Sequence, residues 1–214
     1  MIKITNNGHD SSPPEIKLLV FDLGGVVVSY EWDIVCKGFA QIAGISVDSF
    51  REKLKQVYQH SYEKGHIGTD DIVKHLNNAL NLQLTNEQFE LLWTATFDED
   101  MQMAELLQDL RKQMPLYLLS NTNDVHYRYI EDNFNISRHF QELILSYEVG
   151  WIKPEPEIYH EILKRSGMKA NQCLFIDDLE PNIKGAQAVG LHAHQFIGID
   201  DLRQKLHAFG IKIS

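Results

Sequence analysis

The sequence has few cysteines, no excess of positive charge and no long apolar run. Its two cysteines, Cys36 and Cys173, lie far apart without the spacing of a zinc site, so we expect reduced thiols in a cytoplasmic protein. No stretch is apolar enough to cross a bilayer, and the N-terminus lacks the features of a secretory signal. A formal net charge of −10 disfavours binding to nucleic acid or anionic lipid. Any phosphate that the protein handles must therefore meet local positive charge.

Two common nucleotide-binding motifs are also absent. The sequence contains neither G-x-G-x-x-G after a strand nor G-x-x-x-x-G-K-[ST], which disfavours dinucleotide and P-loop functions. No internal repeat or low-complexity tract is present. These absences leave an ordinary globular protein as the expected class.

Length and periodicity predict an α/β domain interrupted by a helical insert. Residues 1–15 are rich in turn-forming residues, so we expect a flexible N-terminal arm there. Between residues 30 and 110, apolar residues recur at helical spacing with no strand-like run, which predicts four or five helices. We expect residues 30–110 to form a cap domain with an aromatic core, and residues 16–29 and 111–214 to form the α/β core.

Short apolar runs alternate with helical segments in the rest of the chain. The first run, Leu18–Phe21, is apolar on both faces, which is typical of a central strand in a covered parallel sheet. Strands spaced by helices form βαβ units with right-handed crossovers. The predicted fold is therefore α/β, a doubly wound Rossmann-like parallel sheet with an all-helical cap inserted after the first strand. Its expected strands are 18–21, 116–119, 143–145, 173–176 and 192–196.

Polar residues follow directly on three of these strands. Asp22 ends the first strand, and two glycines after it permit a tight turn. Ser120 and Asn121 follow the second strand, and Asp177 and Asp178 follow the fourth. Because the carboxyl ends of parallel strands meet at one edge of the sheet, we expect these residues to converge. Each also has a simpler interpretation, as a strand terminator, a helix cap or a solvated loop pair.

Lys153 is the candidate that carries a positive charge. It stands at the end of a loop, just before a helix that prolines help to start. A nucleophilic carboxylate, a carboxylate pair for Mg²⁺, a hydroxyl, an amide and a lysine are the parts of a phosphoryl-transfer site. In this interpretation Asp22 attacks in line, while Mg²⁺ and Lys153 neutralise the phosphoryl oxygens. Taken alone, Lys153 would be read as a solvated surface lysine.

Four segments, in order, resemble the motifs of the haloacid dehalogenase-like (HAD) hydrolase superfamily. They are Asp22–Val26, Leu119–Asn121, Lys153–Pro156, and Phe175–Asp178 with Asn182. The helical insert resembles the C1-type cap. The second and fourth segments resemble the branch that holds sugar-phosphate phosphatases and the phosphatase domain of soluble epoxide hydrolases. The resemblance implies a Mg²⁺-dependent phosphatase that works through an aspartyl phosphate. Its substrate would be a small phosphorylated metabolite, with a sugar phosphate as one candidate.

The resemblance also implies a role for each residue. Asp22 would be the nucleophile, and Ser120 and Asn121 would bind phosphoryl oxygens. Lys153 would steady both the nucleophile and the phosphate, as a catalytic and substrate-binding residue. The metal ligands would be the carboxylates of Asp22 and Asp178 and the carbonyl of Gly24, with Asp177 beside or behind them and Asn182 orienting the loop.

Gly24 is a departure from the family's pattern. A second aspartate usually stands two residues after the nucleophile, as general acid and then general base, and its loss typically costs about 10²- to 10⁴-fold in rate. Three outcomes are open. The enzyme prefers leaving groups that need little protonation, a cap residue such as Glu31 or a water substitutes, or turnover is lost and phosphate binding is kept.

Two other functions compete with the phosphatase. Dehalogenases of the same superfamily lack the second aspartate and need no metal, but they would have little reason to pair Asp177 with Asp178. A weakened phosphate-binding protein is supported by Gly24 and opposed by the presence of Asp22, Lys153 and Asp178. Loss of activity in EDTA and its return with Mg²⁺ would separate these functions.

Two tryptophans and two histidines are weaker candidates for site residues. Trp32 and Trp151 either border the leaving group or pack structurally. His192 and His194 share a strand face, but no third metal ligand is near in the sequence. The expected partner is a small-molecule phosphate ester, without nucleic acid or membrane, and the expected state is a monomer or homodimer.

Overall fold

A five-stranded parallel sheet organises the protein. The structure is a computed structural model that describes residues 15–58 and 61–213, so the expected N-terminal arm lies outside these residues except for Glu15. The strand order is β5-β4-β1-β6-β7, and all neighbours pair in parallel. The strands are β1 (Leu18–Phe21), β4 (Leu116–Ser120), β5 (Glu142–Leu145), β6 (Cys173–Asp177) and β7 (His192–Gln195).

β1 occupies the centre of the sheet, as its sequence predicts. All four of its residues are fully buried. Phe21 is aligned with Leu118 of β4 on one side and with Ile176 of β6 on the other. A strand with neighbours on both edges and helices on both faces meets no water, which is why it needs no polar alternation.

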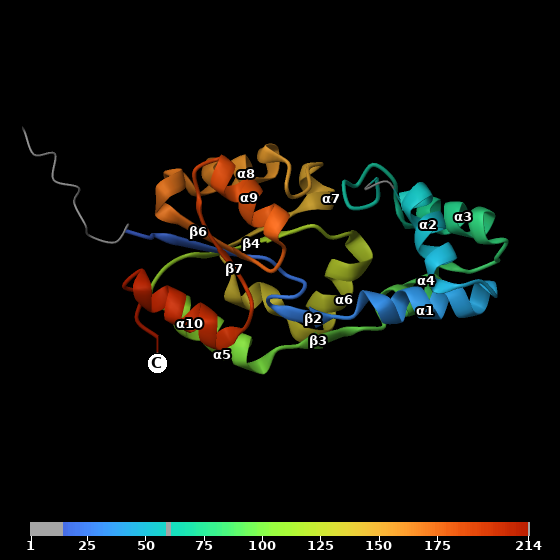
Figure 1. Cartoon of the computed structure of the whole chain (residues 1–214), viewed down its shortest axis with the longest axis horizontal. Helices are drawn as coiled ribbons and strands as arrows, with labels where there is room; N and C mark the ends of the chain where they lie inside the picture. Colours follow the sequence, from blue (N-terminus) through green and yellow to red (C-terminus); the bar gives the residue numbers. More distant parts are fainter. Residues whose placement is uncertain (1–14, 59–60, 214) are drawn as a thin grey trace, which may run out of the picture.

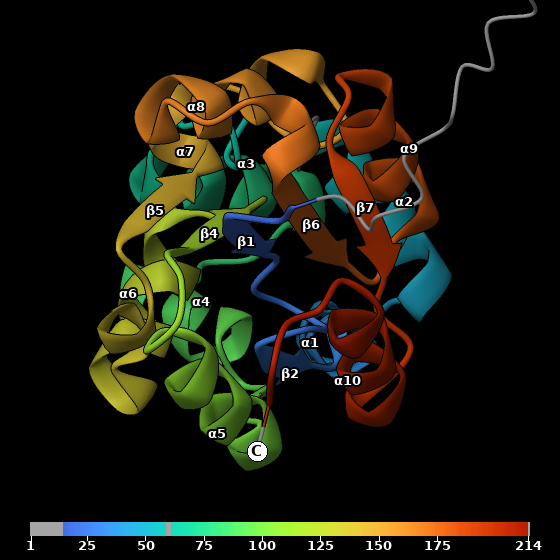
Figure 2. The same cartoon turned by 90° about the vertical axis from the view of Figure 1, so that its left-hand side faces the viewer.

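Helices cover both faces of the sheet, so the predicted doubly wound α/β fold is confirmed (Figure 2). Leu19 and Phe21 pack on one face, and Leu18 and Val20 pack on the other. The first face is covered by α5 (Met101–Leu110), α6 (Asp124–Phe134) and α10 (Ile199–Ala208), and the second by α8 (Pro156–Ser166) and α9 (Glu180–Ala188). Three short elements complete this part, namely η1 (Ile136–His139), α7 (Ser146–Val149) and η2 (Ala170–Gln172).

Four helices form a separate cap beside the sheet (Figure 1). The ring of Phe39 stacks on that of Phe50 at 5.3 Å, and the ring of Trp93 stacks on that of Phe89 at 5.0 Å. Each such pair contributes about 0.5–1.5 kcal/mol beyond area burial. The aromatic residues thus form the expected core of the bundle. The cap helices are α1 (Trp32–Ala43), α2 (Val47–Tyr58), α3 (Thr69–Leu80) and α4 (Asn86–Trp93).

Two short strands join the cap to the sheet domain. β2 (Val28–Tyr30) pairs antiparallel with β3 (Phe97–Glu99), although the sequence suggests no strand between residues 30 and 110. Three residues with one apolar side chain, as in β3, give no periodic signal. The strand is held by its pairing with β2 and by the ring of Phe97, which stacks on that of Tyr30 at 4.7 Å. The helix that follows, α5, buries its leucines in the cluster beneath the sheet. We propose that the cap comprises α1–α4 and that α5 belongs to the core.

His126 links α6 of the core to α4 of the cap. Its Nε2 lies 3.0 Å from the carbonyl oxygen of Trp93, and its Nδ1 lies 3.3 Å from the side-chain nitrogen of Asn123. A neutral ring that donates from Nε2 and accepts at Nδ1 satisfies both contacts. Burial lowers the pKa of His126 to about 4, against the raising effect of the hydrogen bond to Trp93. The folded protein therefore holds this ring in its neutral form.

We expect the protein to lose stability as the pH falls from 6.5 towards 4. The unfolded chain binds a proton at His126 near pH 6.5, whereas the folded chain resists it, so acid favours unfolding. This group should contribute about 2 kcal/mol of destabilisation between pH 7.5 and pH 5. Urea unfolding of the wild type and of His126→Gln at both pH values measures the difference. Burial also lowers the pKa of His139 to about 4. Because His139 is present in both proteins, its contribution to the pH dependence of stability cancels in the comparison. Equal pH dependence of the two proteins would contradict the assignment.

Candidate active site

The polar residues at the strand ends meet at one edge of the sheet, facing the cap. Asp22 follows β1, Ser120 ends β4 and Asp177 ends β6. The main-chain nitrogen of Asp22 donates to the carbonyl oxygen of Ile176 at 2.9 Å, and this hydrogen bond joins the end of β1 to the end of β6. The strands run towards the cap helices in Figure 1, so this edge lies between the two parts of the molecule. The structure thus brings together the residues that the sequence singles out there.

Lys153 is buried between two carboxylates. Its Nζ lies 2.6 Å from Oδ1 of Asp22 and 2.7 Å from Oδ2 of Asp177. Its side chain is only 1% exposed, so it is not the solvated lysine that it would be taken for alone. Burial by itself lowers the pKa of Lys153, but the charges of Asp22 and Asp177 outweigh this effect and raise it. Lys153 is therefore a fixed positive charge beside residue 22.

Asp177 acts as the support for this lysine. Its carboxylate accepts hydrogen bonds from the main-chain nitrogen of Leu179 at 2.8 Å and from Nδ2 of Asn182 at 3.0 Å, in addition to Lys153. With both oxygens already held by donors, Asp177 is better placed to orient Lys153 than to ligate a metal directly. Asn182 thus holds this carboxylate, and the orienting of the loop that the resemblance implies for Asn182 stays a prediction.

The Asp22 carboxylate has one held oxygen and one available oxygen. Oδ1 accepts from the main-chain nitrogen of Leu23 at 2.7 Å and from Lys153. Within residues 15–58 and 61–213 both hydrogen bonds to this side chain go to Oδ1, which leaves Oδ2 for attack. Burial raises the pKa of Asp22 to about 7, opposed by the charge of Lys153 and assisted by that of Asp177. The buried acid thus lacks enough positive charge nearby to hold it fully ionised.

The acidic residues can hold a cation. Ligand oxygens of Asp22, Asp177 and Asp178 all lie within 4.8 Å of one another. The Asp178 carboxylate lies against the turn at Gly25, where an added Cβ would come within 2.8 Å of its Oδ2, so a side chain at residue 25 would displace it. Burial, then the charge of Asp177, raises the pKa of Asp178 as well. Oxygen donors with unfavourable mutual repulsion suit Mg²⁺, which neutralises them.

Asn121 contacts the lysine loop. Its Oδ1 accepts from the main-chain nitrogen of Lys153 at 2.7 Å, and its Nδ2 donates to the Lys153 carbonyl oxygen at 3.0 Å. Both ends of the amide are therefore used to fix the backbone of residue 153. The expected binding of phosphoryl oxygens by Asn121 stays a prediction, and the side-chain geometry favours a positioning role.

Two adjoining hollows open at this edge. The active-site hollow has a volume of about 560 Å³ and includes Asp22, Lys153 and Asp178 in its lining. The second, which we call the aromatic chamber, has a volume of about 180 Å³. Ser120 lines the chamber, and five residues line both hollows, namely Gly24, Tyr30, Trp32, Glu63 and Asn121. The aromatic side chains of the chamber are Tyr30, Trp32, Tyr58, Trp93 and Phe97.

Sequence reasoning missed Glu63 and the double role of the cap aromatics. Glu63 sits in a turn between two cap helices, with no motif around it, and only the packing of the cap on the core brings it to the site. Of the two tryptophans considered, Trp32 lines both hollows, whereas Trp151 lies outside their linings and is 43% exposed. Trp151 instead packs under Lys64, whose Nζ lies 5.9 Å from its ring centroid.

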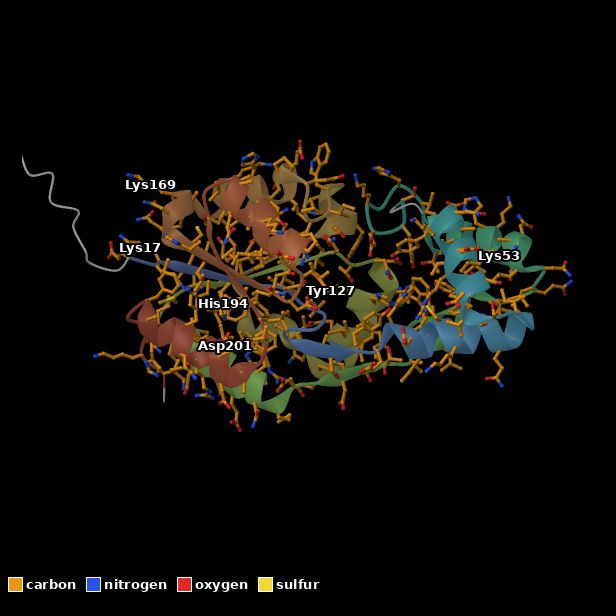
Figure 3. All side chains as sticks on the ribbon, viewed as in Figure 1. Lys17, Lys53, Tyr127, Lys169, His194 and Asp201 are labelled. Carbon is orange, nitrogen blue, oxygen red and sulfur yellow. The ribbon has the colours of Figure 1, made fainter. Side chains whose placement is uncertain are left out.

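The histidine pair on β7 takes no part in the acidic site. His194 lies opposite Asp201 of α10 (Figure 3), with Nε2 and Oδ2 2.9 Å apart. Among the described residues, the group able to hold a metal comprises the three aspartates alone, without either histidine of β7.

The sheet, the cap and the polar strand ends define a hydrolase with a Rossmann-like core. The sequence matches the family model of haloacid dehalogenase-like hydrolases over residues 16–190. The chain belongs to this family, and the resemblance carried by its four motifs is confirmed.

Known relatives extend the comparison. The chain is 30% identical over 200 residues to D-ribitol-5-phosphate phosphatase of Bacteroides thetaiotaomicron. The matched region covers 89% of this chain and 97% of that protein. It is 30% identical to a HAD family enzyme from the same species, solved in complex with magnesium and inorganic phosphate, with a TM-score of 0.77 and coverage of 84% and 93%. L-2-haloacid dehalogenase from Xanthobacter autotrophicus has a TM-score of 0.62 at 16% identity, covering 90% and 82%, and thus shares the fold alone.

Proposed function

We propose that the protein is a Mg²⁺-dependent phosphatase of small phosphorylated metabolites that works through an aspartyl phosphate. The observation that carries this proposal is the buried Lys153, held 2.6 Å from Asp22 and 2.7 Å from Asp177 at the strand edge. A charge fixed in this way, beside a carboxylate with a free oxygen, suits attack on a phosphoryl group. The similarity to a ribitol-phosphate phosphatase and to a magnesium–phosphate complex supports it.

Each residue has a distinct part in the proposed reaction. Asp22 forms the bond to phosphorus through Oδ2, while Lys153 holds Oδ1 and balances negative charge on the phosphoryl oxygens. Ser120 offers its hydroxyl to one of these oxygens from the end of β4. Asp22, Asp178 and the Gly24 carbonyl would hold Mg²⁺, with Asp177 behind them. When bound, the metal supplies positive charge to the transferring phosphoryl group.

A panel of phosphate esters tests this function. We expect Mg²⁺-supported phosphate release from at least one of ribitol 5-phosphate, sugar 1-phosphates and sugar 6-phosphates, and its loss in EDTA. Release of chloride from 2-chloropropionate that persists in EDTA would instead establish the metal-independent dehalogenase. Binding of inorganic phosphate without turnover of any ester would establish the weakened phosphate-binding protein. Either result would overturn the phosphatase.

We propose that the aromatic chamber receives the leaving group. Trp32 lines the chamber and the active-site hollow together, so it would contact any group bonded to the phosphate. Within the described residues, the buried Tyr30 hydroxyl and Trp93 Nε1 have no hydrogen-bond partner. Both residues line the chamber, and after a shift of the side chains that cover these two atoms each could pair with a hydroxyl group of a polyol or sugar. The chamber thus suits a small leaving group with both an apolar face and hydroxyls.

Trp32→Ala is expected to change the ratio of kcat/KM between the best and the next-best ester by about tenfold or more, because removing an aromatic wall alters leaving-group contacts. Trp151→Ala is the matched control, since Trp151 is exposed and outside both hollows; its ratios should stay within about twofold. Kinetics on the same panel, with melting curves for both variants, measure the effect. Unchanged preference in Trp32→Ala would contradict the placement of the leaving group.

We propose a cytoplasmic protein that acts as a monomer or homodimer. Cys36 and Cys173 are both buried free thiols, which suits a reducing compartment. Among the described helices none is long and apolar enough to cross a membrane.

A further inference from the structure

The described site lacks an obvious source for the proton that the leaving group needs. Asp22 is the attacking group, Lys153 is bound to two carboxylates, and Asp178 lies at the cation site. Gly24, where the family's general acid usually stands, has no side chain. A Cβ built on Gly24 would meet no atom within 4 Å, so the space that such an acid would occupy is open.

Glu63 of the cap borders this open space. It lines the active-site hollow and the aromatic chamber together with Gly24, and it is half-buried. Among the residues that the structure describes, it is the one carboxylate in the lining of the chamber, and apart from the strand-edge aspartates the one in the lining of the active-site hollow. Glu31, the cap acid nearest to the motif in sequence, is exposed and belongs to neither lining.

The other titratable groups in these linings are poor proton donors. His126 has both ring nitrogens in contacts with Trp93 and Asn123 and is held neutral. Burial raises the pKa of Tyr30 and of Tyr58. Neither tyrosine gives up its proton readily, whereas a carboxylic acid does.

Contacts with the core hold Glu63 in place although it belongs to the cap. Its carbonyl oxygen lies 2.6 Å from the hydroxyl of Ser146, which also accepts from the main-chain nitrogen of Thr122 at 2.9 Å. The next residue, Lys64, pairs with Glu155 at 2.5 Å, two positions after Lys153.

The following glycine shows how closely the two parts meet. A Cβ on Gly65 would lie 2.1 Å from the carbonyl oxygen of Tyr147, so only glycine permits this contact. Together with the contacts of Glu63 and Lys64, this approach fixes the backbone around Glu63 against α7 and against Glu155. The backbone of residue 63 thus has a defined position relative to the core, and it brings the side chain into the lining of both hollows.

We propose that Glu63 is the general acid and general base of the reaction, in place of the aspartate missing at residue 24. This proposal rests on the proposed phosphatase function. In the first step Asp22 Oδ2 bonds to phosphorus, the bond from phosphorus to the ester oxygen breaks, and protonated Glu63 gives its proton to that oxygen as it leaves. In the second step Glu63 takes a proton from water as the water oxygen attacks phosphorus. The bond from Asp22 to phosphorus then breaks, which releases inorganic phosphate and restores the protonated Glu63.

The leaving-group dependence of Glu63→Gln tests the first step. With enzyme in excess over substrate, we expect release of an alkyl alcohol from the best ester to slow by about 10²- to 10⁴-fold. Release of 4-nitrophenol from 4-nitrophenyl phosphate should slow by less than about tenfold, because this acidic phenol leaves with little protonation. Glu31→Gln is the control and should change neither rate by more than about twofold, as for other exposed sites. Equal slowing of both substrates in Glu63→Gln would indicate a structural role and overturn the proposal, as would no slowing.

Restoring the missing aspartate gives a second test. Because the space at Gly24 is open, Gly24→Asp can be combined with Glu63→Gln, and we expect the double variant to recover alcohol release at least about tenfold over Glu63→Gln. No recovery, with both proteins folded and binding Mg²⁺, would overturn the proposal. Failure of the proposed function has a different readout, because the wild type itself would then release no phosphate from any ester.

Discussion

Replacing Asp22 by asparagine is expected to lower phosphate release from every ester by about 10⁴-fold or more, because the amide cannot form the bond to phosphorus. The substitution is close to isosteric, and the hydrogen bond from Leu23 to Oδ1 can be kept. Turnover under Mg²⁺ saturation is the measurement. Asp33→Asn serves as control, since Asp33 is 62% exposed and pairs only at the surface with Arg51, and its rate should stay within about twofold.

The covalent intermediate gives a second readout for the same variant. Wild-type protein mixed with labelled substrate and quenched in acid should retain phosphate on the chain, whereas Asp22→Asn should retain none. A variant that releases phosphate at the wild-type rate would remove the proposed mechanism. Retained label in the variant would place the nucleophile at another residue.

Lys153→Met should both abolish turnover and destabilise the folded protein by about 3–5 kcal/mol, because it leaves Asp22 and Asp177 buried without their shared cation. Without Lys153 the pKa of Asp22 in the folded protein would rise above its value of about 7. The stability lost in Lys153→Met, relative to the wild type, therefore grows as the pH rises and shrinks as the pH falls. Urea unfolding in EDTA at pH 5 and pH 8 measures this trend, since added Mg²⁺ would replace part of the lost charge.

An exposed lysine provides the comparison for this loss. Lys184 pairs with Glu180 at 2.6 Å while 68% exposed, and Lys184→Met should cost less than about 1 kcal/mol. The double variant Lys153→Met with Asp22→Asn should recover part of the stability, because one buried charge is removed. A loss in Lys153→Met no larger than that in Lys184→Met would show that the buried pair is not strongly coupled.

The sheet and the strand-end residues could be predicted because each leaves a local signal. An apolar run followed by a carboxylate, as at Leu18–Asp22 and Cys173–Asp177, is visible without any knowledge of distant contacts. Parallel pairing then requires the ends to meet, so topology alone brings Asp22 and Asp177 together.

The remaining features depend on tertiary contacts that no periodicity records. Asn121 stands beside Ser120 in the sequence, yet its amide is taken up by the backbone of Lys153, 32 residues away. Glu63 lies 39 residues after Gly24 in a cap turn, and contacts with distant residues set its place: its carbonyl oxygen accepts from Ser146, and Gly65 approaches Tyr147. The pairing of β2 with β3 likewise joins two segments that the four cap helices separate in the sequence.

The β2–β3 ribbon gives the cap a single pivot. Both crossings between cap and core lie in it, and a slip of one residue between its strands would turn every side chain to the opposite face, so the ribbon resists sliding. A swing of the cap about this ribbon would carry Trp32 and Glu63 outward together, and it would break the contacts of Glu63 with Ser146 and of Lys64 with Glu155. An open molecule would then present its nucleophile without its acid, and chemistry would wait until the swing is reversed.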